Sequence, residues 1–354
     1  MPFPADDPQK TQTRIPMIRS RTPGLASGPG CLVECHSVRI ILDTDPGVDD
    51  ALAIMYLAAQ SDAEIVAVGS VHGNVPAPLG ALNALRVLEL VGLNPPVTVG
   101  AARPLAQPLQ TAEFVHGDDG LGGYAGDPPT GSVAPGSAAE QIVRLARAHP
   151  GELTLLALGP LTNVALAVLL EPDLPNLLRS VVVMGGAVTV PGNITPYADA
   201  NFFHDPEAAD LVLGAGFPDL TMVGLDATEQ ARAGTEWLTA LSAAKGPRAD
   251  FANKLLDHYG QFYSNMFGEH SCTLHDPLAA AIMLDQKLAG YREMPLSIEL
   301  TGTHTRGQVV SDLRLISSDA YIATNAGAGR VPVKVAETVD VPTFLDQMFK
   351  ALQT

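Results

Sequence analysis

Short runs of Val, Ile and Leu alternate with longer stretches rich in Ala and Leu along most of the chain. We predict strands from the short runs and helices from the longer stretches, because a buried strand is short, apolar and bounded by turn residues. The predicted strands are 38–42, 65–68, 97–99, 153–157, 181–183 and 220–223, and the predicted helices are 49–60, 79–91, 138–148 and most of 236–267. This alternation predicts an α/β fold of the Rossmann-like type, with a mostly parallel central sheet and helices on both faces.

The two ends of the chain depart from this pattern. Three β-like runs lie close together before a C-terminal helix at 342–352, and they predict a small antiparallel addition to the sheet. These runs are 296–300, 309–316 and 331–339. Residues 1–36 are rich in Pro, Gly, Ser and Thr and lack the apolar segment of a signal peptide. We therefore expect a disordered N-terminal extension at 1–36 and a single domain at 37–354.

Composition narrows the class of protein. The chain has 354 residues, of which 46% are hydrophobic, and this is ample for a large core. The formal net charge of −17 argues against nucleic acid or an anionic membrane as a partner, and no run of 18 apolar residues predicts a membrane span. The three cysteines, Cys31, Cys35 and Cys272, lack the spacing of a zinc site, so we expect a reducing, cytoplasmic location.

Candidate chemistry begins where the first strand ends. The strand 38–42 is followed by four aspartates within eight positions, and a Pro-Gly pair at 46–47 forces a turn between them. The four are Asp43, Asp45, Asp49 and Asp50. One of them is explained as a helix cap, but four carboxylates this close repel one another unless a cation lies among them. Because hard carboxylate oxygens suit Ca²⁺ or Mg²⁺, we predict a divalent metal at this turn.

The stretch D-T-D-P-G-V-D-D-A at 43–51 resembles the N-terminal signature of the nucleoside hydrolases, the inosine-uridine-preferring family of Ca²⁺-dependent N-ribohydrolases. Further blocks resemble the family's motifs in the same order. They are V-H-G-N at 71–74, H-G-D-D-G-L-G-G at 116–123, L-G-P-L-T-N at 158–163, M-G-G to D-P-E-A-A across 184–209, and H-D-P-L-A at 275–279.

The resemblance implies a bound Ca²⁺ whose ligands are Asp45, Asp50, Asp276 and the main-chain carbonyl of Leu158. Leu158 stands where the family usually has Thr, but a carbonyl ligand does not depend on the side chain. Taken alone, Asp276 would be the N-cap of the helix that follows it. Thr162 and Asn163 are interpreted as the N-cap region of the next helix, and Asp205 to Ala209 as a helix start with Pro206 at the first helical position.

The resemblance also implies a set of ribonucleoside contacts. They are Asp49, Asn74, His116, Met184, Asn193, Asp199, Asn201 and Tyr263. Asn74 by itself could be a plain turn residue, and His116 could be a solvent-facing loop histidine. Asp199 stands where the family usually has Glu, so its side chain reaches about one methylene less far. Tyr259, Phe262 and Tyr263 lie at helical spacing and could be core aromatics, an interpretation we favour for Phe262.

The function implied is hydrolysis of the N-glycosidic bond of ribonucleosides to ribose and free base. Asp45 would activate a calcium-bound water, His275 would assist the leaving group, and Asp43 would orient the turn and Asn74. In the purine-specific branch of the family the base stacks between tryptophans, but the single tryptophan here, Trp237, lies far from these blocks in the sequence. The resemblance therefore leaves inosine, uridine and cytidine as candidate substrates. The family resemblance further implies a homotetramer or homodimer.

Two other functions remain as alternatives. A non-catalytic nucleoside-binding member of the family would share every motif. A haloacid-dehalogenase-type phosphatase is suggested by the D-x-D of Asp43 and Asp45 after a strand. That motif needs Thr or Val where this chain has Gly47, and it also needs a later Lys with an acidic pair that the sequence does not show.

Overall fold

The computed structural model of the chain describes residues 37–268, 270–314 and 329–353. Its centre is an eight-stranded sheet in the order β3-β2-β1-β4-β5-β6-β12-β9. The strands are β1 (Val38–Thr44), β2 (Ala63–Ser70), β3 (Val97–Val99), β4 (Leu153–Ala157), β5 (Ser180–Met184), β6 (Leu220–Val223), β9 (Ala289–Met294) and β12 (Val333–Val339). All neighbours pair in parallel except β9, which is antiparallel to β12. The predicted mostly parallel sheet is confirmed.

The C-terminal part of the sheet is more closely integrated than the sequence suggested. Strand β12 lies within the run 331–339, which we assigned to the antiparallel addition. It does pair antiparallel with β9, but it also pairs in parallel with β6 and so lies inside the central sheet. Strand β9 was not predicted. Two small antiparallel pairs complete the strands, β7 (Arg232–Ala233) with β8 (Cys272–Thr273) and β10 (Ser297–Ile298) with β11 (Val309–Val310).

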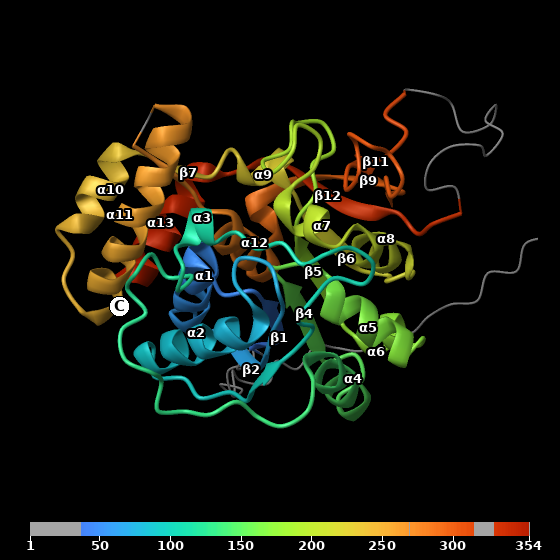
Figure 1. Cartoon of the computed structure of the whole chain (residues 1–354), viewed down its shortest axis with the longest axis horizontal. Helices are drawn as coiled ribbons and strands as arrows, with labels where there is room; N and C mark the ends of the chain where they lie inside the picture. Colours follow the sequence, from blue (N-terminus) through green and yellow to red (C-terminus); the bar gives the residue numbers. More distant parts are fainter. Residues whose placement is uncertain (1–36, 269, 315–328, 354) are drawn as a thin grey trace, which may run out of the picture. The chain divides into compact units, whose positions relative to one another are not determined.

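Helices cover both faces of the sheet, as predicted (Figure 1). The longer helices are α1 (Val48–Ala58), α2 (Ala77–Leu90), α4 (Ala138–Ala148), α5 (Thr162–Leu170), α8 (Pro206–Gly214), α10 (Thr235–Ser242), α11 (Pro247–Phe267), α12 (His275–Leu284) and α13 (Val341–Leu352). The short ones are α3 (Glu113–His116), α6 (Leu174–Leu177), α7 (Ala200–His204), α9 (Leu225–Thr228) and the 3₁₀ turn η1 (Gln286–Leu288).

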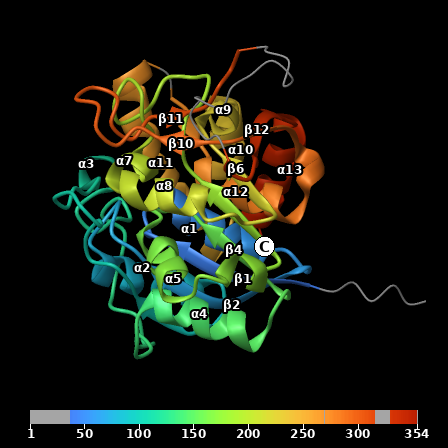
Figure 2. The ribbon, with the colours of Figure 1, turned by 90° about the vertical axis from the view of Figure 1, so that its right-hand side faces the viewer.

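Alternate side chains of each strand pack into two separate cores. Ile40 and Leu42 of β1 belong to the core under α1, α2, α12 and α13, whereas Ile41 belongs to the core under α4, α5 and α8. Because successive side chains of a strand point to opposite faces, a strand buried on both sides reads as a continuous apolar run. Figure 2 shows α4, α5 and α8 grouped on their side of the sheet.

Helix starts follow local signals in most cases. Asp205 is the N-cap of α8, its carboxylate accepts the backbone N–H of Ala208, and Pro206 occupies the first turn, which confirms that interpretation. Thr162 and Asn163 lie in the predicted N-cap region, as the first two residues of α5 after its N-cap Leu161. Neither side chain caps the helix: the Thr162 hydroxyl donates to Asp205, and the Asn163 amide donates to Asp43 of β1.

Some expectations concern residues outside the described part of the chain. The disordered extension at 1–36 and the end of the run 309–316 fall there, and the division into an extension and one domain at 37–354 stays a prediction. Among the described residues, no helix is long and apolar enough to cross a membrane.

Candidate active site

The site lies at the edge of the sheet where the parallel strands end. Strands β1, β2, β4 and β5 end at residues 44, 70, 157 and 184, and the segments that follow them carry most of the predicted site residues. Parallel strands end on one edge, so blocks far apart in the sequence meet there. Helix α12 reaches the same place from much later in the chain, because it packs directly against α1.

Asp50 organises the turn between β1 and α1. One of its carboxylate oxygens accepts the backbone N–H of Gly47 (2.9 Å) and the side-chain amide of Asn74 (2.9 Å). The other accepts the hydroxyl of Thr44 and, at 3.3 Å, the backbone N–H of Asp45. Asp50 therefore does cap the start of α1. The side chain of Asn74 is bound to Asp50, so Asn74 is more than a plain turn residue.

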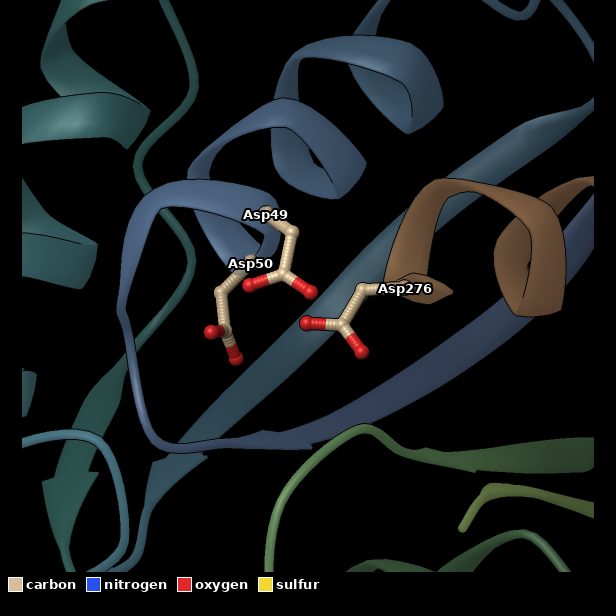
Figure 3. A group of neighbouring side chains, drawn as sticks. All are labelled: Asp49, Asp50 and Asp276. Atoms are coloured by element: carbon tan, nitrogen blue, oxygen red, sulfur yellow. The ribbon is translucent and has the colours of Figure 1, made fainter. Parts of the chain in front are cut away.

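The carboxylates of Asp49, Asp50 and Asp276 converge, with one oxygen of each lying within 4.8 Å of the others. Figure 3 shows the three side chains pointing toward one another from the first turns of α1 and α12. Asp276 is buried and lies inside the first turn of α12, after the N-cap residue Leu274, so it is not the cap of that helix. The group includes Asp49, which we predicted to contact substrate, and leaves out Asp45, which we predicted to bind the metal.

Asp45 occupies a narrow slot between two loops. Its Oδ2 accepts the backbone N–H of Asn74 (2.7 Å), while Oδ1 is buried and has no hydrogen-bond partner among the described residues. A Cβ atom added at Gly73 would lie 2.0 Å from Oδ2, and one added at Gly159 would lie 2.5 Å from Oδ1. Only glycine at both positions leaves room for this carboxylate.

Burial raises the pKa values of the four site carboxyl groups, which are those of Asp45, Asp49, Asp50 and Asp276. For Asp45 the next cause is the charge of Asp50, and for Asp276 it is the charge of Asp49; both pKa values lie well above the usual range. Burial and the Asp50 charge raise the pKa of Asp49 to about 8. Burial also raises the pKa of Asp50, against its hydrogen bonds. Keeping these four buried carboxylates ionised without a cation costs free energy, and the Oδ1 of Asp45 has no hydrogen-bond donor among the described residues to offset that cost. The four side chains therefore fit a hard divalent cation.

The carbonyl of Leu158 and the amide of Asn201 meet on the other side of the site. Nδ2 of Asn201 donates to the Leu158 oxygen (2.7 Å) and to the Met184 oxygen (3.1 Å). The structure therefore brings together a predicted metal ligand and two predicted ribose contacts, and the Asn201 amide occupies the carbonyl that we assigned to the metal. The ligand role of Leu158 stays a prediction.

Asp199 and Asn193 hold the 184–201 segment in place. Asp199 is the N-cap of α7, and its buried carboxylate accepts the backbone N–H groups of Gly186 (2.6 Å), Asn201 (3.0 Å) and Phe202 (3.1 Å). Burial raises the pKa of Asp199 to about 6, against these hydrogen bonds. Asn193 is exposed and accepts the backbone N–H of Ala200 (2.9 Å). Their contacts with ribose stay predictions.

His275 is held from both ends of its ring. Nδ1 lies 2.8 Å from the Thr228 hydroxyl, and Nε2 lies 3.1 Å from the Tyr263 hydroxyl. Burial lowers the pKa of His275 to about 4, so the ring is neutral at pH 7. Tyr263 is both a core aromatic, packed edge-on against Tyr259 at 5.0 Å, and a partner of the site histidine. Phe262 is partly buried against the same core, which agrees with our interpretation.

The long loop at 101–136 closes onto the turn. His116 is buried rather than solvent-facing, and its Nδ1 accepts the backbone N–H of Val48 (3.1 Å) at the start of α1. Burial lowers the pKa of His116 to about 3, and its ring centre lies 5.6 Å from that of Tyr259. His258 of α11 holds the same loop through the carbonyl of Val115 (3.0 Å).

Asp119 gives the glycine-rich part of this loop its shape. Its carboxylate accepts the backbone N–H groups of Leu121 (2.9 Å), Gly123 (2.8 Å) and Ala125 (2.9 Å). Partial burial raises the pKa of Asp119, but the three N–H groups outweigh it, and the pKa lies below the usual value. Sequence reasoning missed this role, although an Asp before a Gly-rich run is a common way to build a turn.

We expect Asp119→Ala to raise KM by several-fold and to lower kcat to a smaller extent, because the loop loses three internal hydrogen bonds but no predicted catalytic group. Steady-state kinetics with a ribonucleoside measure both constants. Because the folded pKa of Asp119 is depressed, its contribution to loop stability is present above the unfolded pKa and is lost as the pH falls through the folded pKa. A fall in kcat with unchanged KM would contradict this assignment.

The partner that we predicted for Asp43 is wrong. Instead of Asn74, its Oδ1 accepts the side-chain amide of Asn163 (2.8 Å), which also donates to the Ser70 carbonyl (3.0 Å) and accepts from the backbone N–H of Ala101 (2.7 Å). Burial raises the pKa of Asp43 to about 7. Asn163 thus ties three strand ends together behind the site. No local signal in the sequence distinguishes this role from a helix cap.

The fold and the site define an α/β protein with a buried acidic site at the carboxyl edge of its sheet. A family model described as inosine-uridine preferring nucleoside hydrolase matches residues 40–346. The chain belongs to this family, and it is a nucleoside hydrolase. The phosphatase alternative is therefore excluded.

Individual relatives agree over nearly their full length. The chain is 36% identical to the probable uridine nucleosidase 1 of Oryza sativa subsp. japonica, over 88% of this chain and 95% of the relative. It is 37% identical to the pyrimidine-specific ribonucleoside hydrolase RihA of Shewanella woodyi, over 89% and 98%. Among solved structures, the plant nucleoside hydrolase PpNRh1 matches with a TM-score of 0.85 at 30% identity, covering 90% of this chain and 99% of that one. A purine-preferring ribonucleoside hydrolase from Gardnerella vaginalis matches with a TM-score of 0.79 at 30% identity, covering 89% and 98%.

Proposed function

We propose that this enzyme hydrolyses the N-glycosidic bond of ribonucleosides with the help of Ca²⁺, and that Asp45 takes the proton of the attacking water. The observation that carries the proposal is the buried, unpartnered Oδ1 of Asp45 beside three further carboxylates. An oxygen without a hydrogen-bond donor is free to accept a proton from a water in the site. A cation nearby would favour the ionised form of Asp45, which burial alone disfavours.

The residues that would hold the ion are Asp45, Asp50, Asp276 and the carbonyl of Leu158. Asp49 converges with Asp50 and Asp276 and faces the same space, so its carboxylate would accept a ribose hydroxyl there. When bound, Ca²⁺ would supply positive charge that lowers the pKa of the attacking water and orients the sugar hydroxyls. Acidic side chains around the sugar would in turn favour the positive charge that develops on the ribose as the bond breaks.

The substrate would lie between the strand ends and the 113–125 loop. Asn74 and Asn201 carry neutral amides suited to sugar hydroxyls, and Met184 lies beside Asn201 with its sulfur 3.3 Å from the amide nitrogen. His116 and Tyr263 would face the base. His275, neutral and held by Thr228 at Nδ1, would donate a hydrogen bond from Nε2 to the departing base.

The relatives support a choice among the candidate bases. Several plant relatives are described as uridine nucleosidases, and several bacterial relatives as pyrimidine-specific ribonucleoside hydrolases. These descriptions favour uridine and cytidine over inosine as substrates of this enzyme. We further propose a homotetramer or homodimer in the cytoplasm, from the family resemblance and the low use of cysteine.

We expect the purified enzyme to release reducing sugar from uridine, and we expect a calcium chelator to lower the rate by roughly 10²-fold or more, because water activation and ribose orientation are lost together. Added Ca²⁺ should restore the rate and raise the free energy of unfolding, by about 2.7 kcal/mol at 100 times Kd. A panel of uridine, cytidine, inosine and adenosine gives the base preference. Calorimetric nucleoside binding without sugar release would favour the non-catalytic alternative, and a rate indifferent to chelator and Ca²⁺ would end the metal proposal.

A further inference from the structure

A buried amide on helix α2 connects the aspartate turn to the loop that closes over it. Asn83 is fully buried, and its Nδ2 donates to the carbonyl of Pro46 (3.2 Å) and to the carbonyl of Asp119 (2.8 Å). Pro46 lies in the turn between Asp45 and Asp49, and Asp119 is the residue that shapes the 117–125 loop. One side chain thus reaches two segments that are far apart in the sequence and that both border the site.

The chemistry of the three partners defines the orientation of this amide. The Oδ1 of Asn83 accepts a hydrogen bond from the guanidinium of Arg86 (2.9 Å), which also donates to the carbonyl of Asp127 (3.2 Å). Carbonyl oxygens only accept and a guanidinium only donates, so the reversed amide would face two acceptors with an oxygen and one donor with an N–H. Arg86 therefore locks the NH₂ group of Asn83 toward the turn and the loop.

The loop approaches Asn83 closely because its nearest residue has no side chain. A Cβ added at Gly120 would lie 2.8 Å from Nδ2 of Asn83 and 3.1 Å from the carbonyl of Pro46. Gly120 also has a φ of +77°, which L side chains rarely adopt. Any other residue at this position would push the loop away from both the amide and the turn.

The loop is tied to the aspartate turn at a second point. His116 accepts the backbone N–H of Val48, the residue directly before Asp49 and Asp50. The segment from Pro46 to Asp50 is therefore held from the loop side through Pro46 and through Val48. Neither contact involves a carboxylate of the site, so the loop can act on the position of the carboxylates without touching them.

From these contacts we infer that Asn83 is a positioning residue that couples the 117–125 loop to the carboxylate turn, so that the closed loop holds Asp45, Asp49 and Asp50 in their working positions. The inference rests on the proposed function. It predicts that loss of the amide affects both segments together. A residue that only supported the fold would lower stability and leave the two segments independent.

The test compares Asn83→Ala and Gly120→Ala with Gln141→Ala. Gln141 is a matched control, because it is a buried amide on α4 that joins Thr98 and the Pro96 carbonyl at β3, away from the site. The measurements are kcat and KM for uridine and the hydrogen exchange of the backbone amides at 47–50 and 117–125. Hydrogen exchange needs no substrate, so it tests the coupling between the two segments even if no hydrolysis can be measured.

We expect Asn83→Ala and Gly120→Ala each to lower kcat/KM by roughly 10- to 100-fold, with both kcat and KM affected, since misplacement by about an ångström costs this much. The amides at 47–50 and 117–125 should exchange faster together in both variants. In Gln141→Ala the kinetic constants and the exchange at these two segments should stay as in the parent enzyme, even if the melting temperature falls.

The inference is overturned if exchange increases only at 117–125 while kcat is unchanged, or if Gln141→Ala reproduces the effects of Asn83→Ala. Should Asn83→Ala fail to fold, Arg86→Ala keeps the amide but removes the contact that orients it, together with the contact to the Asp127 carbonyl, and should show the same joint change at smaller size. If the parent enzyme cleaves no ribonucleoside, the proposed function fails; a joint change in exchange would then still support the coupling, and separate changes would refute it.

Discussion

The Asp45→Asn enzyme should lose activity by orders of magnitude, because the loss of a general base alone typically costs about 10²–10⁴-fold and this change also removes a proposed metal ligand. The amide oxygen of the substituted side chain can still accept the backbone N–H of Asn74. Its NH₂ group would then occupy the place of the unpartnered Oδ1 and cannot take a proton from water. Single-turnover kinetics with uridine measure the chemical step directly.

Asp43→Asn provides the matched comparison, because Asp43 is the same residue type, is buried and lies two positions away. It accepts a hydrogen bond from Asn163 and has no proposed contact with the reacting atoms, so we expect a much smaller loss. Circular dichroism of both variants checks that the fold is kept. Equal losses in two folded variants would refute the division of roles between Asp45 and Asp43.

The His275→Ala enzyme should lose far more activity on uridine than on p-nitrophenyl riboside. A departing pyrimidine gains from a hydrogen bond donated by the neutral ring, whereas nitrophenolate leaves as a stable anion and needs none. Loss of such acid–base assistance typically costs about 10²–10⁴-fold. Thr228 fixes the ring at Nδ1, so the role falls to Nε2, whose partner in this structure is the Tyr263 hydroxyl. The ratio of the two losses in kcat/KM is the decisive measurement.

His116→Ala is the control for leaving-group assistance. His116 is also a buried, neutral histidine at the site, but its Nδ1 accepts from the start of α1, which ties it to the closure of the loop. We expect a higher KM for both substrates and an unchanged ratio between them. If His275→Ala slowed both substrates alike, His275 would have to support Asp276 or the ribose instead.

The fold was predictable where local pattern and burial agree. Strands β3, β4 and β6 and helix α4 have the predicted bounds, because each is a run with clear turn residues on both sides. Strand β9 was missed because its residues are mostly exposed or half-buried and it reads A-G-Y-R-E-M. The parallel pairing of β12 with β6 was also missed, since strand direction depends on the connection through the preceding elements and not on the run itself.

The sequence by itself predicted the acidic turn and the polar blocks that follow the strand ends. Each of these depends on residue type and on spacing within a few positions, where turn chemistry and strand alternation act directly. Gly73 and Gly159 each lie just beyond a strand end, but only the structure shows that they leave room for the Asp45 carboxylate. The family followed from these local blocks.

Only the tertiary structure decided which of these residues touch. Asp276 joins Asp49 and Asp50 because α12 packs on α1, Asp43 pairs with Asn163 rather than Asn74, and Asp199 uses its carboxylate to accept backbone N–H groups. Asn83 gives no signal in the sequence, because a polar residue on a helix acquires its partners from segments that arrive through folding. The physical reason is the same in each case. A hydrogen bond, or the interaction between two neighbouring charges, depends on how close the groups lie in space, and their separation along the chain does not determine that distance.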